Sequence, residues 1–293
     1  MEEIVYLNGE LIPRSQARVS AFDHGFLYGY GLFETMRAYH GKIFLLERHL
    51  KRLADSAEAI GLASGLAGFD LAKACLDTLR ANNQDDARIR LTVSNGESDA
   101  FPWSGVSTRP TVLVTARSYT PFSEEKYRHG FKVGVASERR CRESLVSRVK
   151  SVSSLVSALS RMEAVAAGLD EALLLNDRGV IAEGGGSNVF FVQASGLLTP
   201  SLESGILPGI TRGVVMELAD ALGIGITEGD VSLPDLEHCD EAFFTNSMIE
   251  IMPLVAVRDE AGQMITIGSG KPGEVTGRLM AAYKERVQRE TES

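Results

Sequence analysis

The chain has 293 residues, 44% of them hydrophobic, and a mean hydropathy of -0.01, which indicates a globular protein with apolar material for one large or two ordinary domains. Its net charge of -9 argues against nucleic acid or an anionic membrane as a partner, but leaves room for a local cationic pocket. Three cysteines without paired spacing, an acidic start and no apolar run of ~20 residues predict a cytoplasmic protein with reduced thiols, no metal site and no membrane span.

The first part of the chain alternates between strand and helix patterns. Asn8-Gly9 lies between two short apolar runs, which is a strong signal for a β-hairpin turn. Apolar residues at helical spacing over 46–60, followed by Gly61, predict a helix that ends at a glycine. In chain order, the expected elements are a hairpin over 4–13, strands over 32–39 and 42–45, helices over 46–60 and 70–81, and strands over 87–94 and 111–116. The polar segment 95–110 is predicted to be a loop.

A shift in composition marks residues 118–129, which we interpret as a linker. It would join a small N-terminal α/β domain, residues 1–117, to a larger C-terminal α/β domain, residues 130–293. In the second domain we expect strands over 131–136, 239–245 and 254–257, a strand that ends at Lys150, and two strands that flank the turn 176–179. The expected helices are 153–167, 210–222 and 272–289. The predicted fold class is therefore α/β in two domains.

Lys150 and Glu183 stand 33 residues apart, and the second is followed by three glycines. This pair fits the needs of pyridoxal phosphate, whose aldehyde forms a Schiff base with an amine and whose ring nitrogen pairs with a carboxylate. Glycines beside the carboxylate let the backbone approach a flat ring. Judged by the spacing alone, a surface lysine at the end of a strand is the better interpretation of Lys150, and a solvated carboxylate in a hairpin is the alternative for Glu183.

Several longer sequence motifs follow one another along the chain. They are Phe22-Asp23-His24-Gly25-Phe26-Leu27-Tyr28-Gly29, Phe33-Glu34-Thr35-Met36-Arg37, His49-Leu50-Lys51-Arg52-Leu53, Leu207-Pro208-Gly209-Ile210-Thr211-Arg212 and Thr245-Asn246-Ser247-Met248-Ile249-Glu250. With the core segment 150–188, they make the chain resemble the fold-type IV pyridoxal-phosphate enzymes over roughly residues 6–283. That family holds branched-chain and D-amino-acid aminotransferases, (R)-amine transaminases and 4-amino-4-deoxychorismate lyase.

The resemblance implies a pyridoxal 5'-phosphate cofactor and an active site between the two domains. In that comparison Lys150 is the catalytic residue, which forms the Schiff base and moves the proton, and Glu183 pairs with the pyridine nitrogen. Further contacts to the cofactor and its phosphate would come from Arg52, Ser187, Asn188, Ile210, Thr211 and Ser247. The substrate would be lined by Tyr28, Thr35, Arg37, Arg90 and Met248. A homodimer is also implied, with the loop 95–110 as the candidate segment that completes the neighbour's site.

These residues fit more than one reaction. We expect an aminotransferase that passes an amino group between an amino acid or amine and a 2-oxo acid through the Lys150 Schiff base. The alternative is 4-amino-4-deoxychorismate lyase, which releases pyruvate and 4-aminobenzoate. It is considered because Thr35 and Asn246 lie in motifs that resemble those of the lyases. A catalytically silent binding protein is a third interpretation, and the joint presence of Lys150, Glu183 and Arg52 argues against it. No tyrosine follows Lys150 closely, unlike in many members, which weakens a strict branched-chain assignment.

Overall fold

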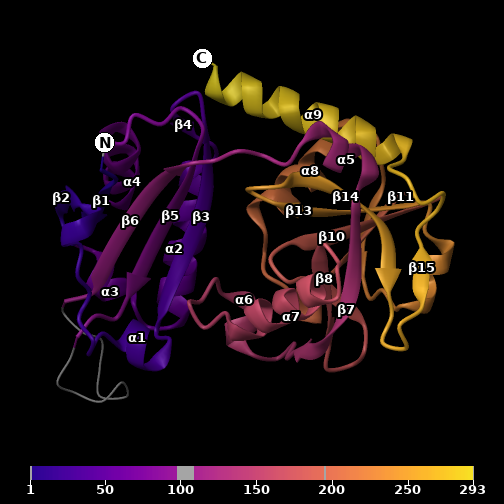
Figure 1. Ribbon diagram of the computed structural model, residues 1–293, viewed down its shortest axis with the longest axis horizontal. Coiled ribbons are helices and arrows are strands. Elements are labelled where there is room, and N and C mark those ends of the chain that lie inside the picture. Colours follow the sequence, from indigo (N-terminus) through magenta and orange to yellow (C-terminus); the bar gives the residue numbers. More distant parts are fainter. Residues whose placement is uncertain (1, 98–108, 195, 293) are drawn as a thin grey trace. The chain divides into compact units, whose positions relative to one another are not determined.

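The chain forms two compact units in a computed structural model that describes residues 2–97, 109–194 and 196–292 (Figure 1). The first unit comprises Met1–Thr120, Val149–Ser153 and Val287–Ser293, and the second comprises Pro121–Arg148 and Ser154–Arg286. The change of unit after Thr120 falls within residues 118–129, which we propose as the linker between two domains and which contain the helix α5 (Glu124–His129). Each unit is built around a β-sheet of its own.

The sheet of the first unit has six strands among the described residues, in the order β2-β1-β6-β5-β3-β4. The predicted hairpin is confirmed, because Asn8 and Gly9 both have positive φ between the antiparallel strands β1 and β2. The strands are β1 (Ile4–Leu7), β2 (Glu10–Pro13), β3 (Gly31–Tyr39), β4 (Lys42–Ile43), β5 (Ala87–Ser94) and β6 (Thr111–Ser118). The α-helices are α1 (His24–Tyr28), α2 (Leu46–Ala59), α3 (Ala63–Leu66) and α4 (Leu71–Ala81).

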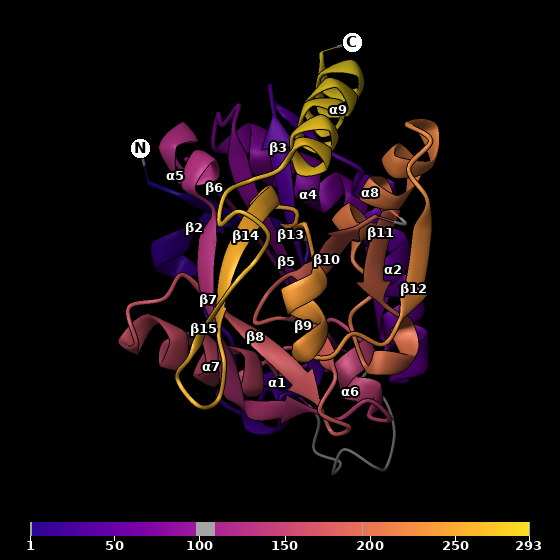
Figure 2. The same cartoon turned by 90° about the vertical axis from the view of Figure 1, so that its right-hand side faces the viewer.

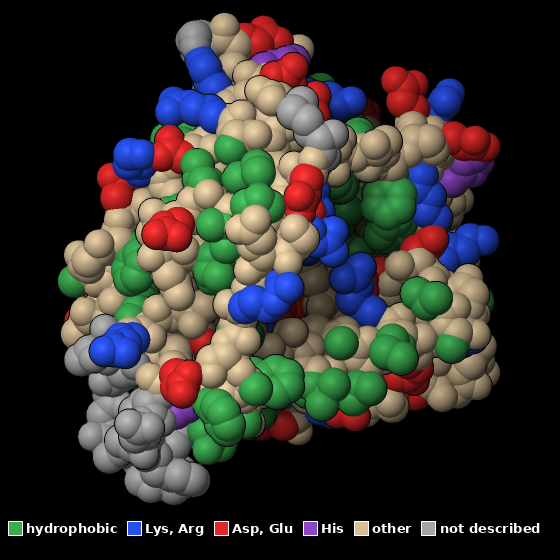
Figure 3. Space-filling model, turned by 60° about the vertical axis from the view of Figure 1, so that its left-hand side comes forward, with side chains coloured by type: hydrophobic (Ala, Val, Ile, Leu, Met, Phe, Trp, Pro, Cys, Tyr) green, Lys and Arg blue, Asp and Glu red, His purple; other side chains and the backbone are tan. Residues whose placement is uncertain are grey.

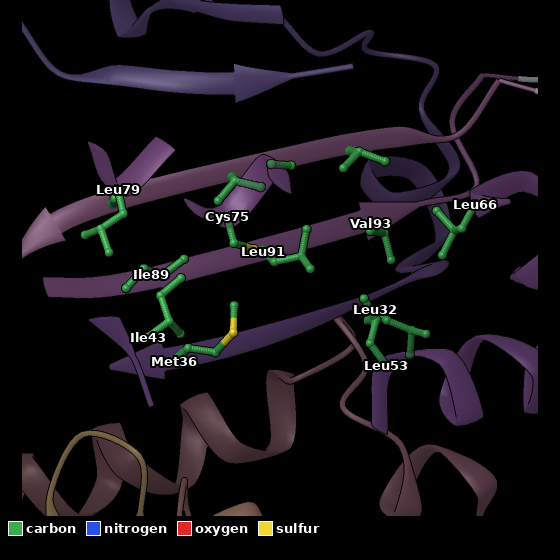
Figure 4. Packing of buried hydrophobic residues seen from close by; sticks show 14 of the residues in the cluster. Leu32, Met36, Ile43, Leu53, Leu66, Cys75, Leu79, Ile89, Leu91 and Val93 are labelled. Atoms are coloured by element: carbon green, nitrogen blue, oxygen red, sulfur yellow. The ribbon is translucent and has the colours of Figure 1, made fainter. Parts of the chain in front are cut away.

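One face of this sheet carries the core of the first unit. Side chains at alternate positions of β3 and β5 are fully buried, and α2 and α4 cover them with their own apolar side chains (Figure 4). The labelled examples are Leu32, Met36, Ile89 and Leu91 from the strands and Leu53, Cys75 and Leu79 from the helices. Burial of each large apolar side chain contributes about 1.5–3 kcal/mol. The opposite face of the sheet is therefore the one on which polar side chains of β3, β5 and β6 can gather.

The second unit has a nine-stranded sheet within the described ranges, with the order β12-β11-β10-β13-β14-β7-β8-β9 and β15 paired to β14 (Figure 2). β7 pairs in parallel with β14 and with β8, so the sheet is mixed. The strands are β7 (Phe131–Arg140), β8 (Glu171–Asn176), β9 (Ile181–Gly184), β10 (Asn188–Gln193), β11 (Gly196–Pro200), β12 (Ile226–Gly229), β13 (Glu241–Asn246), β14 (Glu250–Arg258) and β15 (Met264–Thr266). The remaining α-helices are α6 (Leu145–Arg148), α7 (Leu155–Ala166), α8 (Ile210–Ala221) and α9 (Glu274–Thr291).

The longer predicted helices are confirmed as α2, α4, α7, α8 and α9. Asp70 accepts a hydrogen bond from the amide of Lys73 and so caps α4. No helix in the described part of the chain has the length and apolar character that crossing a bilayer requires. Most of the predicted loop 95–110 lies outside the described residues.

The prediction that Lys150 ends an apolar strand is wrong. The short helix α6 precedes it, and Ser151 forms an isolated antiparallel bridge with Leu32 of β3. β4 covers one edge of β3 only at Ala38 and Tyr39, which leaves the earlier part of that edge available for pairing. The segment 149–153 fills this place, which explains why it packs with the first unit and not with the residues on either side of it in sequence.

Candidate active site

Lys150 is fixed to the first unit through its main chain. Its carbonyl accepts a hydrogen bond of 2.9 Å from the amide of Phe33, and the amide of Val152 donates to the carbonyl of Gly31 at 3.0 Å. The Nζ atom of Lys150 lies 4.7 Å from the centroid of the Phe33 ring, within the range of a cation–π contact. The pairing with β3 therefore places the lysine amine against an aromatic side chain on the outer face of the sheet.

Arg52 lies on α2 and forms a bidentate ion pair with Glu34 of β3. Its Nε donates to Oε1 at 2.8 Å and its Nη2 to Oε2 at 2.6 Å, while the Nδ1 of His49 lies 2.7 Å from Oε2. Burial alone would raise the pKa of Glu34, but the hydrogen bond with His49 and the charge and hydrogen bonds of Arg52 lower it to about 2. Burial lowers the pKa of His49, although Glu34 opposes that shift. At neutral pH, Glu34 is therefore an anion, and a neutral His49 donates to it from Nδ1.

The outer face of the first sheet carries the substrate residues predicted on β3 and β5. In the strand register Thr35 stands opposite Arg90, and Arg37 stands opposite Arg88. Arg37 is buried, and its guanidinium lies 4.3 Å from the centroid of the Tyr39 ring. Side chains at these alternate positions project to the side away from the apolar core. The structure therefore brings Thr35, Arg37 and Arg90 together on one face.

A cavity of about 250 Å³ opens on this face between β5 and β6. It is lined by Arg88, Arg90, Thr92, Leu113, Thr115 and Arg117. The Arg90 guanidinium lies 3.7 Å from the centroid of Phe33, the same ring that Lys150 contacts. Burial and the neighbouring charge of Arg88 lower the pKa of Arg90 to about 10, so it remains a cation at neutral pH. The cavity thus offers several cationic groups and two hydroxyl groups to an anionic ligand.

Tyr28, the remaining substrate candidate in the first unit, is the last residue of α1. Its side chain is half exposed, and its ring packs edge-on against His24 at a centroid distance of 5.3 Å. The next residue, Gly29, accepts a hydrogen bond of 3.1 Å from the hydroxyl of Ser153. This bond ties the end of α1 to the segment that carries Lys150.

Glu183 lies on β9 of the second unit as a buried carboxylate with partners on both oxygens. The Nη2 atom of Arg140 lies 2.6 Å from Oε1 and also donates to the carbonyl of Ser147 at 2.8 Å. Oε2 accepts from the amide of Leu207 at 3.0 Å and from the side-chain amide of Asn188 at 3.3 Å. A carboxylate with cationic and amide donors keeps its negative charge even when buried. Glu183 is therefore suited to pair with a protonated ring nitrogen.

Two residues with buried hydroxyl groups lie beside Asn188, the amide partner of this carboxylate. Asn188 of β10 stands opposite Thr245 of β13, and Ser187 immediately precedes Asn188. Ser187 Oγ and Thr245 Oγ1 have no hydrogen-bond partner among the residues that the structure describes. Gly184 makes room for this arrangement, since a Cβ atom at that position would lie 2.3 Å from Ser187 Oγ. A buried hydroxyl without a partner costs free energy, because it has lost its hydrogen bonds to water. A polar ligand bound beside it can replace those hydrogen bonds.

The start of α8 lies against Asn188. A Cβ atom on Gly209 would come 1.9 Å from Asn188 Oδ1, so only glycine allows this approach. Gly209 is also the N-cap of α8 and provides no side chain to cap the helix. The first amides of the helix, at Ile210 and Thr211, form the positive end of its dipole, which is a general anion-binding arrangement. The Glu183 network and the predicted phosphate site are therefore adjacent within the second unit.

The turn between β13 and β14 is held by Asn246. Its Oδ1 accepts from the amides of Met248 at 2.8 Å and Ile249 at 2.9 Å. Its Nδ2 donates to the carbonyl of Gly186 at 2.9 Å, which joins the turn to the glycine loop after Glu183. Ser247 and Met248, predicted to contact phosphate and substrate, both lie in this turn.

The predicted site residues thus form two groups, one in each unit. The first unit gathers Tyr28, Thr35, Arg37, Arg52, Arg90 and Lys150, and the second gathers Glu183, Ser187, Asn188, Ile210, Thr211, Ser247 and Met248. The sequence interpretation missed Glu34, His49 and Arg140. Glu34 could have been found, because it interrupts the alternating apolar positions Leu32 and Met36 and so requires a partner. Arg140 gives no comparable signal, since an arginine at a strand end is usually solvated.

The chain is similar to known proteins over nearly its whole length. The family described as Amino-transferase class IV matches residues 31–257. A protein of Methanocaldococcus jannaschii, provisionally named a branched-chain-amino-acid aminotransferase, is 38% identical over 96% of this chain and 95% of its own length. The aminodeoxychorismate lyase of Bacillus subtilis is 33% identical over 97% of this chain and 95% of its own length. The T.th. branched-chain amino acid aminotransferase, solved with pyridoxamine 5'-phosphate, has a TM-score of 0.88 at 31% identity, and the match covers 100% of this chain and 97% of the other.

The two sheets with their helices, and the relatives that match over nearly the whole chain, make this an α/β enzyme. More narrowly, the chain belongs to the class IV aminotransferase family, whose members are pyridoxal-phosphate enzymes with the fold-type IV architecture. Both aminotransferases and a lyase are found among its relatives.

Proposed function

We propose that this chain binds pyridoxal 5'-phosphate and transfers an amino group between an amino acid or amine and a 2-oxo acid. The observation that carries the proposal is the network around the buried Glu183 carboxylate, whose partner Asn188 lies against an uncapped helix start and beside two residues with buried hydroxyls. These donors and acceptors suit a ligand with a protonated ring nitrogen and a phosphate group. The residues present therefore fit the cofactor of the family.

The roles of the residues follow from their chemistry. When bound, pyridoxal 5'-phosphate supplies an aldehyde for amines and a protonated ring that withdraws electrons from the bonds broken at the amine carbon. Glu183 would hold the proton on the ring nitrogen, and Arg140 and Asn188 keep that carboxylate charged and oriented. Arg52, the amides of Ile210 and Thr211, and Ser247 would bind the phosphate. Lys150 Nζ would bind the aldehyde and then carry the proton to and from the substrate carbon.

A second function, the aminodeoxychorismate lyase reaction, is favoured by one relative and by one residue. The relative is the Bacillus subtilis lyase, and the residue is Thr35, whose hydroxyl lies on the outer face beside Arg90. The reactions differ in product, so the test is a panel of amino donors with pyruvate or 2-oxoglutarate, run beside an assay for 4-aminobenzoate. We expect transamination to dominate. A rate of 4-aminobenzoate release well above every transamination rate would establish the lyase instead.

The arginine-lined cavity leads to a prediction about the amino acceptor. Arg90→Gln is expected to lower kcat/KM for 2-oxoglutarate by ~10- to 100-fold, because the second carboxylate of this acceptor would lose its cationic partner. A change of this size is usual when a charge-assisted hydrogen bond is lost. Turnover of pyruvate, which has no second carboxylate, should change little. Arg80→Gln is the matched control, since Arg80 lies on α4 and pairs with Asp77. Equal losses with both acceptors would show that Arg90 does not select for the second carboxylate.

We also propose a homodimer in the cytoplasm. α7 exposes Leu155, Met162 and Val165 to between 66% and 69%, and Figure 3 shows hydrophobic side chains at the surface of one face. Exposed apolar patches commonly mark protein interfaces. The free thiols of the three cysteines support a reducing compartment. Light scattering at the assay concentration measures the mass directly, and an active monomer would exclude a site shared between subunits.

A further inference from the structure

Glu34 is a carboxylate on the face of the first sheet that carries the apolar core. It projects from β3 toward α2, on the same face of the sheet as Leu32 and Met36, and it has no solvent exposure. All three side-chain contacts described above converge on it, two from Arg52 and one from His49. Removing such a charge from water costs several kcal/mol, and apolar side chains of similar size often stabilise a core at least as well. The trio is therefore poorly explained by core stability alone.

The geometry of the trio restricts Arg52 strongly. Both oxygens of Glu34 engage the guanidinium along the edge formed by Nε and Nη2, which fixes the plane of the group. His49 lies three residues before Arg52 on α2, on the same side of the helix, and holds Oε2 from another direction. The edge of the guanidinium that carries Nη1 is thus turned away from Glu34. An arginine side chain, which normally loses much rotamer freedom on binding a ligand, is ordered in advance here.

We propose that Glu34 and His49 are positioning residues, which hold the Arg52 guanidinium in a fixed orientation for the phosphate group of the cofactor. The inference rests on the proposed function, because Arg52 is a phosphate contact only if pyridoxal 5'-phosphate binds. It extends that function by giving a phosphate-directed role to two buried side chains that do not themselves contact the ligand. Besides burial, the positive charges of Arg52 and Lys150 both act to lower the pKa of His49.

The test compares pyridoxal 5'-phosphate with pyridoxal, which lacks the phosphate. The apo-protein is titrated with each compound by absorbance, and the ratio of the two Kd values measures discrimination for phosphate. Glu34→Gln keeps the shape of the side chain but cannot accept from both guanidinium nitrogens, so this ratio should fall by ~10-fold or more. Affinity for pyridoxal should be nearly unchanged. The effect should also vanish in an Arg52→Ala background, because residues that act through one another are not additive.

Controls separate positioning from stability. Asp23→Asn removes another buried carboxylate of the first unit, which accepts from Gly25, Ser94 and Thr111, and it should leave the ratio unchanged. If Glu34→Gln does not fold, His49→Leu gives the same readout with a smaller loss, and His49→Asn, which restores a donor near the Nδ1 position, should recover most of it. A wild-type protein that does not bind pyridoxal 5'-phosphate contradicts the proposed function. A wild type that binds it, with an unchanged ratio in the folded Glu34 or His49 variant, overturns only the positioning role.

Discussion

Replacing Lys150 by alanine is expected to abolish the covalent adduct with pyridoxal 5'-phosphate and to lower turnover by about 10²- to 10⁴-fold, the usual contribution of a positioned acid–base group. The side chain supplies the only atom proposed to bind the aldehyde and also the group that moves the proton. Alanine leaves the main-chain bonds to β3 in place, since the carbonyl of residue 150 still accepts from Phe33. The fold of the first unit should therefore be preserved, and a circular dichroism melt checks this.

Borohydride reduction identifies the attachment point. In the wild type, the reduced adduct blocks tryptic cleavage at Lys150, so the labelled peptide should span residues 149–161. Lys126→Ala is the control, because Lys126 pairs with Asp170 in the second unit and should keep both label and turnover. A small primary amine added to Lys150→Ala should restore part of the turnover, since it can carry the proton in place of Nζ. A label that persists on the Lys150→Ala protein would contradict the assignment.

Most of the fold can be predicted from local patterns because its elements are locally consistent. The Asn8-Gly9 turn, the helix before Gly61 and the Asp70 cap each depend on residues near in sequence, and all three are confirmed. β14 begins at Glu250, earlier than the predicted start at residue 254, and Pro253 lies inside it opposite Phe243. Proline is uncommon in a strand interior, so this earlier start is not favoured by the local sequence. The place of Lys150 could not be predicted, since it depends on an edge of β3 that only the folded sheet leaves open.

The candidate site divides in the same way. Each of the three principal residues, Lys150, Glu183 and Arg52, lies in a sequence motif that can be recognised by itself. The partners that hold their side chains or main chain in place are distant in sequence. Arg140 lies far from Glu183 along the chain, and nothing local indicates that the two side chains meet. The link between Asn188 and the start of α8 likewise depends on the absence of a Cβ atom at Gly209, which is visible only in three dimensions. Contacts of this kind determine charge and orientation, and a single sequence does not contain them.

Glu183→Gln is expected to lower turnover by about 10²- to 10³-fold, as the loss of a fixed electrostatic partner in an active site commonly does. A neutral amide cannot hold the proton on the ring nitrogen, so that ring would withdraw electrons less strongly. Stability should fall as well, because Arg140 would keep its charge, with its side chain only 14% exposed, and lose its carboxylate partner. The measurements are kcat with the preferred donor and the free energy of unfolding in urea.

A second substitution separates the two effects. Glu183→Gln combined with Arg140→Gln removes both charges, so most of the lost stability should return while turnover stays low. Glu241→Gln is the matched control in the same sheet, since Glu241 is also buried and accepts from the amides of Val275 and Thr276 at the start of α9. It should lower stability with little change in kcat. If the double variant regained turnover together with stability, Glu183 would serve the fold alone, and its assignment to the ring nitrogen would be wrong.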